Sequence, residues 1–300
     1  MEHLVSMSEA RAEVRSLGRR GRSLDALARL RVHCSHRSPT VRDDAVRACA
    51  RVGRRGGAEV QGRAATMLLQ AATDRHLLVR NAAAESMGWL RSATFVGMLA
   101  GIAAGDAEPV LRASAAEALG EYPVPAARKA LRIALLDRVE FVRAYAALSL
   151  GRVGLKTDVA RLRRAGRRDD ESHTNRAELA AARLRLGDVS GIDELLTVLQ
   201  SSDKDVVSRI IMILDDQLQR DGPQRLRRHR RRLVAALQLC ARSLPKRCFL
   251  MSQCRRICRD ASGRGVARES GRSRAGASCR RCTPRSRSDR PARRRRRPRR

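Results

Sequence analysis

A stretch of about 30 residues recurs along the first two thirds of this chain. The segments DAEPVLRASAAEALGEY (residues 106–122) and DRVEFVRAYAALSLGRVG (residues 137–154) place the same residue types at the same positions. A repeat of this length predicts a solenoid, in which each unit buries its apolar face only against its neighbours. Alignment on one arginine gives six copies, 31 to 38 residues apart: Arg42, Arg80, Arg112, Arg143, Arg176 and Arg209.

Each copy has the periodicity of a helix. The residues three and four positions after the arginine are apolar in all six copies, which places them on one helix face. A small residue stands eight positions after the arginine in four copies, namely Ala50, Gly88, Gly120 and Gly151. Small residues on that face predict that neighbouring helices approach one another closely. A glycine stands at position eleven in three copies, where a positive φ past the helix end is expected: Gly53, Gly154 and Gly187.

A second helical segment precedes each arginine, so the predicted unit is helix, turn, helix. Asp and Pro mark the turns, and we expect Asp106 and Asp137 at N-cap positions and Pro39 and Pro109 in first turns. The array is predicted to span residues 23–221, after an N-terminal segment of residues 1–22. The first helices are expected at residues 23–34, 58–72, 93–104, 125–136, 158–166 and 191–200.

The run Asp-x-x-Val-Arg-x-x-Ala-Ala-x-Ala-Leu-Gly, clearest at residues 106–120 and 137–154, is similar to the HEAT-repeat family. It resembles in particular the short type named after phycobilisome lyases. The resemblance implies an all-α fold, a right-handed α-solenoid (α-α superhelix) of about six helix-turn-helix repeats. The sixth copy departs, because Asp216 and Gln217 stand where Leu and Gly stand elsewhere. Either this copy lies near the end of the array or its register differs.

Two roles are open to the recurrent arginines. They could form a row of cations that binds an acidic partner. Alternatively, each could pair with an aspartate of its own or the adjacent turn, such as Asp106 or Asp137, and so fix the stacking of the repeats. The second role is favoured, because Asp and Arg recur together.

Stacked repeats leave one long concave surface, lined by the second helices, and such surfaces bind extended protein partners. The sequence therefore predicts a non-enzymatic scaffold for protein–protein interaction. Exposed positions on the second helices are the predicted contacts: Asp43, Arg47, Asn81, Glu85, Glu117, Arg183 and Asp216.

Motifs for catalysis or metal binding are weak or missing. The chain has no Gly-x-Ser-x-Gly or P-loop run, and its six histidines lack the His-Glu pairs that a resemblance to di-iron hydroxylases with these repeats would need. Four cysteines could supply thiolates to zinc, but only one pair has an acceptable spacing, and they lie among residues that could not build a core around the metal: Cys254, Cys258, Cys279 and Cys282. No catalytic residue, metal or cofactor is predicted.

A second alternative function is a lyase-like or DNA-glycosylase-like enzymatic activity, inferred by analogy with families that share this fold. HEAT-like repeats occur in phycobilin lyases and in alkylpurine DNA glycosylases, which use aromatic residues at the lesion. Aromatic residues make up only 2% of this chain, and its single tryptophan, Trp89, is expected to pack between repeats.

The C-terminal part of the chain does not show the repeat pattern. Residues 222–245 could form one extra amphipathic helix, and residues 246–300 are an Arg-rich low-complexity tail that is expected to be disordered. Most of the net charge of +33 lies after Asp221. The first alternative function is therefore nucleic-acid binding through this tail or a basic groove. Equally, the tail's Arg, Pro, Cys and Ser content is typical of a GC-rich gene read in a shifted frame, and both interpretations stay open.

The remaining features concern location. The first residues lack the apolar middle of a signal peptide, and no early run of 18 apolar residues is present. Of eight cysteines only Cys34 and Cys49 lie in the repeat region, so a disulfide framework is not expected. We expect a cytoplasmic protein without a membrane span.

Overall fold

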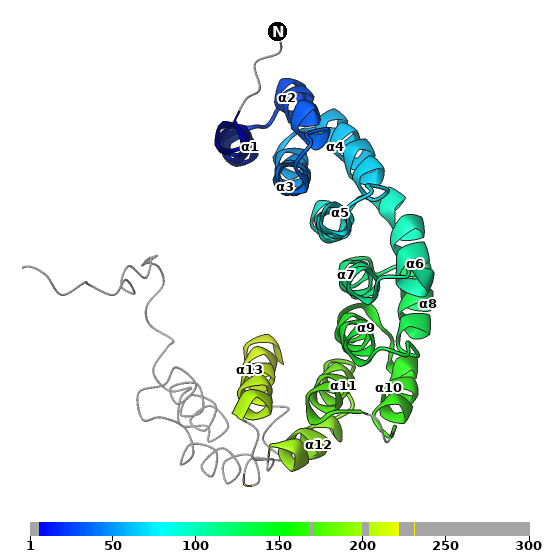
Figure 1. The fold of residues 1–300 in the computed structure, drawn as a ribbon. Helices are drawn as coiled ribbons and strands as arrows, with labels where there is room; N and C mark the ends of the chain where they lie inside the picture. The colour runs from blue at the N-terminus through cyan, green and yellow to red at the C-terminus, as the bar shows by residue number, and fades with distance from the viewer. Residues whose placement is uncertain (1–5, 169–170, 200–203, 222–230, 232–300) are drawn as a thin grey trace, which may run out of the picture.

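The computed structural model describes residues 6–168, 171–199, 204–221 and 231. Within these ranges it contains α-helices, two short 3-10 helices (Ala93–Phe95 and Lys156–Asp158) and no strand. The chain is an all-α solenoid, as the repeat predicts. Figure 1 shows the helices in two curved rows, one inside the other.

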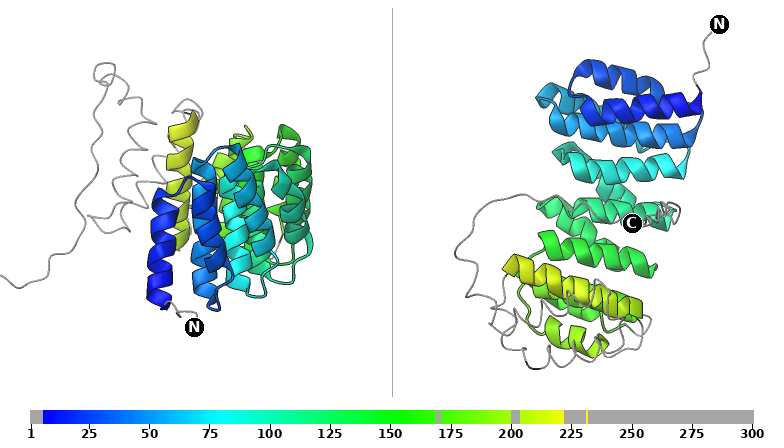
Figure 2. Two further views of the ribbon diagram at one scale, coloured as in Figure 1. Left: turned by 90° about the horizontal axis from the view of Figure 1, so that it is seen from above. Right: turned by 90° about the vertical axis from the view of Figure 1, so that its left-hand side faces the viewer.

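The outer row consists of the predicted first helices. These are α2 (Leu24–Cys34), α4 (Ala58–Ala71), α6 (Val96–Gly105), α8 (Pro125–Ala134), α10 (Val159–Ala165) and α12 (Gly191–Val198). The inner row holds the helices that carry the repeat arginines: α3 (Pro39–Arg55), α5 (Leu77–Leu90), α7 (Pro109–Leu119), α9 (Glu140–Val153), α11 (His173–Arg185) and α13 (Lys204–Asp221). The side view in Figure 2 shows these inner helices stacked nearly parallel, one above the next.

One helix precedes the repeats. The repeat pattern does not include residues 1–22, yet α1 (Met7–Arg20) lies in the inner row and packs on α3. Its start is fixed by a capping box, in which Ser6 and Glu9 exchange hydrogen bonds. Ala10 and Val14 bury its apolar face. The inner row therefore begins one helix before the first complete repeat.

Small residues stand where the inner helices touch, as the sequence predicts. A Cβ added at Gly88 would lie 3.0 Å from the Cα of Ala118 on α7. A Cβ added at Gly151 would lie 2.9 Å from the Cα of Ala182 on α11. Real Cβ atoms need more room than this, so the two glycines set the distance between successive inner helices.

The turn aspartates differ from the prediction in their position. They are not the N-cap residues but stand two residues earlier, and each carboxylate accepts a hydrogen bond from the backbone N–H of the N-cap residue. This arrangement closes the turn before the helix begins, because an aspartate side chain can bond the backbone two residues on. The bonds are Asp74–His76 at 2.8 Å, Asp106–Glu108 at 2.9 Å and Asp137–Val139 at 2.8 Å. Pro39 and Pro109 begin α3 and α7, as expected.

The prediction for the terminal glycines is right at one position and wrong at two. Gly187 has a φ of 96°. Gly53 instead lies inside α3, because that helix continues to Arg55. Gly154 has a φ of −70° and a ψ of 178°, since the chain leaves α9 in an extended conformation toward the next 3-10 helix.

Several predictions concern parts of the chain outside the described residues. They are the extra helix at residues 222–245, of which only Arg231 is described, the tail at residues 246–300, and the four cysteines considered for zinc. The end of the array at residue 221 stays a prediction. Among the helices that the structure describes, none is long and apolar enough to cross a membrane.

Candidate functional site

Two of the repeat arginines tie one repeat to the next through a bidentate ion pair. Arg42 binds Asp74 through Nε and Nη2, both at 2.8 Å, and its Nη1 donates to the carbonyl of His36 at 2.9 Å. Arg112 binds Asp137 in the same way, at 2.7 and 2.9 Å. The hydrogen bonds from these guanidinium groups lower the pKa of Asp74 and of Asp137. Each arginine therefore links the carbonyl of its own turn to the carboxylate of the next turn.

The other four arginines vary this arrangement. Arg143 is 1% exposed and pairs with Glu171, while Arg209 pairs backward with Glu178 on α11. Arg80 and Arg176 donate to backbone carbonyls, and within the described ranges neither forms an ion pair. The backward pair of Arg209 shows that the sixth copy differs from the others in its contacts.

An ion pair in the outer row was missed by sequence reasoning. Arg132 on α8 binds Asp158 through Nε at 2.6 Å and Nη2 at 3.1 Å. The Asp158 side chain is fully buried. Burial would raise its pKa, but the hydrogen bonds from Arg132 and from the backbone of Leu155 outweigh it, so the pKa is lowered. Alignment on the second helices alone could not reveal this pair.

Four of the predicted concave-surface residues contact one another. Arg47 on α3 binds Asp43 at 3.0 Å and Glu85 on α5 at 2.6 Å. Asn81 donates to Glu85 at 2.8 Å and accepts from Ser114 on α7 at 2.7 Å. These half-buried side chains form one hydrogen-bonded network across three inner helices, so much of their polarity is used inside the protein.

The other three predicted contact residues do not belong to this network. The prediction for Arg183 is wrong, because this side chain is 4% exposed and binds Glu194 on α12 at 2.6 Å. It points toward the outer row, because position seven lies on the same helix face as the repeat arginine, opposite the inner surface. Glu117 is partly exposed on α7. The side chain of Asp216 lies outside the described part of the chain.

A row of exposed apolar side chains runs along the inner helices. Leu78, Val110 and Phe141 each stand two residues before the repeat arginine, in the first turns of α5, α7 and α9. They are 37%, 50% and 42% exposed. Tyr145, one turn after Phe141 on α9, is 38% exposed. We call these four residues the apolar row.

Helix geometry places the apolar row on the inner surface. The exposed or partly exposed residues of α9 all lie within one face of the helix, at the spacing i, i+1, i+4, i+5, i+8 and i+12. They are Glu140, Phe141, Ala144, Tyr145, Leu148 and Arg152. Helices α5, α7 and α9 each have an inner neighbour on either flank and an outer helix behind them. The remaining face, which carries this stripe, is the inner surface of the arc.

The same geometry corrects the prediction for Trp89. Its side chain does not pack between repeats but is 46% exposed. Trp89 stands eleven residues after Leu78, so the two side chains lie on the same face of α5. The sequence could have indicated the apolar row, because the residue two positions before the arginine is apolar in three successive copies: Leu78, Val110 and Phe141.

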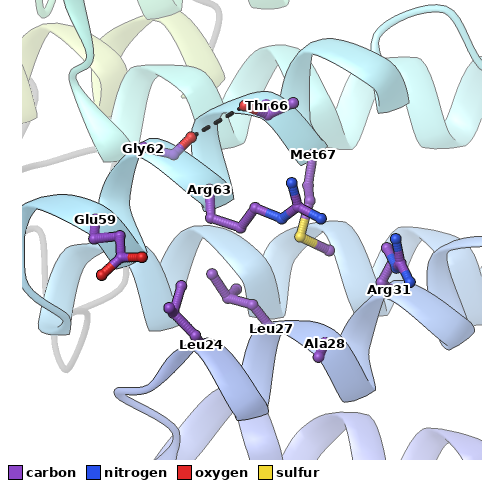
Figure 3. A pocket seen from close by; sticks show the side chains of 9 residues that line it. All are labelled: Leu24, Leu27, Ala28, Arg31, Glu59, Gly62, Arg63, Thr66 and Met67. Atoms are coloured by element: carbon purple, nitrogen blue, oxygen red, sulfur yellow. Dashed lines mark hydrogen bonds between the residues drawn. The ribbon is translucent and has the colours of Figure 1, made fainter.

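A groove on the outer row is a second concave feature. It lies between α2 and α4 and has a volume of about 520 Å³. Figure 3 shows Leu24, Leu27 and Met67 at its wall and Arg31 and Arg63 beside it. The hydrogen bond drawn there, from Thr66 to the carbonyl of Gly62 at 3.2 Å, belongs to α4 itself. Polar groups do not converge on one point, so this groove specifies no ligand. Among the described residues, no three His, Cys, Asp or Glu side chains cluster as metal ligands would.

Known proteins resemble this chain in its repeat sequence and in its fold. Residues 97–183 match the family model of HEAT repeats. The complex of CpcE and CpcF of phycocyanin lyase from Nostoc sp. PCC7120 is similar, with a TM-score of 0.53 and 14% identity over 77% of this chain and 93% of that chain. A mutant of Kap121p has a TM-score of 0.53 and 13% identity over 76% of this chain and 27% of that chain. No curated protein sequence matches.

These likenesses agree on the fold. Identities of 13% and 14% show a shared architecture and do not transfer an activity. The resemblance that the repeat motif implied is confirmed by the matched segment, which contains three of the repeat arginines, Arg112, Arg143 and Arg176. Residues 97–183 of this α-solenoid therefore match HEAT repeats in sequence, and the solved structures agree with that fold.

Proposed function

We propose that this protein is a non-enzymatic scaffold that binds a segment of another protein along the inner surface of its solenoid. The observation that carries the proposal is the apolar row: Leu78, Val110 and Phe141 are exposed at matching positions on successive helices, and Tyr145 is exposed one turn after Phe141. Contiguous exposed apolar side chains on a soluble protein typically mark an interaction site. The likeness to a phycocyanin lyase complex rests on fold alone and supports no lyase chemistry here.

The spacing of the row defines the partner segment. Packed helices lie about 8–10 Å apart, so successive apolar side chains recur at about that interval. A segment in the polyproline II conformation rises about 3.1 Å per residue with three residues per turn, so it would match the row with an apolar side chain at every third residue. A helix, rising about 1.5 Å per residue, would need one every six or seven residues.

The charge beside the row adds a second requirement. Glu117 lies on the same face of α7 as Val110, seven residues further on, and within the described ranges its carboxylate has no hydrogen-bond partner. A lysine or arginine of the partner would pair with it. The proposed partner is therefore a segment with regularly spaced apolar side chains and a basic residue beside them.

The test compares substitutions on the two faces of the full chain. The double variant Val110→Asp, Phe141→Asp places charge in the apolar row. Ile133→Asp, on α8 of the outer row, is the matched control, because Ile133 is 49% exposed and Val110 is 50% exposed. Affinity capture from nuclease-treated lysate is quantified for the three proteins, and each captured protein is then re-tested in purified form.

We expect a purified partner that binds the wild type and the Ile133→Asp variant with the same Kd. Binding to the double variant should weaken at least about tenfold, because each charge must be desolvated at the interface. Equal binding of all three proteins would overturn the proposal, provided that their circular dichroism spectra agree.

Nucleic-acid binding is the second candidate, and exposed aromatic side chains favour it. Trp89, Phe141 and Tyr145 are all partly exposed, and aromatic rings can stack on unpaired bases. A complex of this kind would weaken steeply with salt, whereas an apolar interface would be much less sensitive. Capture of nuclease-sensitive material that is lost at moderate salt would favour this candidate over the scaffold.

We also propose that the protein works in the cytoplasm. Cys34 and Cys49 are free thiols in the structure. Reducing compartments maintain that state, whereas close cysteines of secreted proteins are usually oxidised.

A further inference from the structure

Two cysteine thiols lie against each other in the first repeat. Cys34 is the last residue of α2, and Cys49 lies in the middle of α3. Their Sγ atoms are 3.9 Å apart. They come from different helices of one repeat, 15 residues apart in the chain.

This distance is short enough for a disulfide. The S–S bond is about 2.05 Å long, so the two sulfur atoms must approach by about 2 Å. Rotation about a Cα–Cβ bond from one rotamer to another can move a sulfur atom over that range. Cys34 ends its helix and is partly exposed, which leaves its side chain room to rotate.

The two thiols differ in accessibility and in acidity. Cys49 is fully buried, whereas Cys34 reaches the surface. The hydrogen bond from the Cys49 thiol lowers the pKa of Cys34. The same bond, together with burial, raises the pKa of Cys49. An external reagent therefore meets Cys34 first, and its thiolate is the better nucleophile near neutral pH.

We propose that Cys34 and Cys49 are a redox-active dithiol, which a low-molecular-weight disulfide oxidises to an intramolecular disulfide. The Cys34 thiolate attacks one sulfur of the reagent, forms a mixed disulfide and releases one thiolate. Cys49 then loses its proton to solvent and attacks the Cys34 sulfur, which releases the second thiolate. The protein loses two electrons and two protons, and the reagent disulfide is reduced to two thiols.

Oxidation acts on the N-terminal end of the solenoid. The cross-link closes a loop of 15 residues and fastens α2 to α3. Closing such a loop stabilises the folded state, chiefly because it restricts the unfolded chain. Asp74 is near enough to raise the pKa of Cys34 by its charge, so the dithiol lies beside the Arg42–Asp74 pair that joins the first two repeats.

The experiment treats the full chain with glutathione disulfide and maps the products by trypsin and mass spectrometry. The chain has six cysteines outside the repeats, so a total thiol count would not be specific. Trypsin releases Cys34 in VHCSHR (residues 32–37) and Cys49 in ACAR (residues 48–51). A disulfide-linked pair of these two peptides is the expected product, and dithiothreitol should remove it.

Two variants distinguish this reaction from general thiol oxidation. Cys49→Ser should retain glutathione on residues 32–37, because no second thiol displaces it. Cys34→Ser should leave Cys49 unmodified, because that thiol is buried. The oxidised wild type should also unfold at a midpoint several degrees higher than the reduced protein, a shift missing in both variants.

Two results would overturn the proposal. One is a wild type that accumulates glutathione on Cys34 as Cys49→Ser does, without the linked peptides. The other is a Cys34 that remains unmodified while cysteines elsewhere in the same sample react. Because both readings come from the wild type, they stand even where a variant folds poorly. Neither depends on the proposed binding function.

Discussion

Two paired arginines, Arg42 and Arg112, join successive repeats through buried ion pairs. Arg42 and Arg112 are each 5% exposed, a burial that charged residues tolerate only when they are paired. Each guanidinium is satisfied on three sides by one carboxylate and the carbonyls of its own turn. Planar, bidentate pairing of this kind requires arginine, and lysine could not replace it.

Removal of one carboxylate should therefore strongly destabilise the array. Asp137→Ala leaves the Arg112 charge buried without its partner, which typically costs about 3–5 kcal/mol. Denaturant unfolding of the variant should show a loss of about 3 kcal/mol. Arg91→Ala is the control, because Arg91 is 65% exposed in its pair with Glu121 and should cost less than about 1 kcal/mol. Similar losses in both variants would contradict the assignment.

The same carboxylates predict how stability depends on pH. Hydrogen bonds from Arg42 and Arg112 lower the pKa values of Asp74 and Asp137 below their ordinary value of 3.8. The folded state then holds its protons less tightly than the unfolded chain, so the added stability is present above about pH 4 and is lost as the pH falls further. Urea unfolding between pH 6 and pH 2 should show this decline. Asp137→Asn, which cannot ionise, should show a shallower decline, and an equal slope would contradict the prediction.

At the scale of the helix, small residues decide how closely the inner row can pack. Gly151 on α9 faces the backbone of α11, with room for a hydrogen atom but not for a methyl group. Gly101 on α6 has no neighbour within 4 Å of an added Cβ. Both glycines lie inside helices, but only Gly101 has room for a larger side chain.

Alanine substitution at these two positions should change stability in opposite directions. Gly101→Ala should raise the free energy of unfolding by about 0.5–1 kcal/mol, because alanine restricts the unfolded chain and favours the helix. Gly151→Ala gains the same amount but forces two helices apart, which costs about 1–3 kcal/mol, so a net loss is expected. Thermal and urea unfolding of both variants check this. A stabilised Gly151→Ala protein would show that the helices separate freely.

At the scale of the whole molecule, each repeat is supported only by its neighbours. Helices α5, α7 and α9 have an inner neighbour on both sides, while α1 has one on one side only. Stability in such an array is a sum of repeat and interface contributions, so it should be highest in the centre.

Hydrogen exchange should show this gradient. We expect the amides of α5, α7 and α9 to exchange most slowly and those of α1 to exchange faster, because α1 has an inner neighbour on one side only. Exchange measured by mass spectrometry on the full chain resolves these segments. Uniform protection from α1 to α13 would mean that the solenoid unfolds as one unit.

Periodicity alone determined the architecture of this protein. The recurring arginine, the apolar pair after it and the small residue at position eight predict helix pairs and close inner contacts, since these depend on spacing within one repeat. The first helices α2, α4 and α8 begin within one residue of their predicted starts for this reason.

Only the tertiary structure decided which side chains face the inner surface. Arg183 and Trp89 each lie on an inner helix, yet the charged residue is buried and the tryptophan is exposed. Exposure depends on contacts with the helices before, after and behind, and these come from residues some 30 positions away in sequence. The pairing of Cys34 with Cys49 likewise depends on how α2 packs against α3. The distance between the two thiols cannot be derived from their spacing in the sequence.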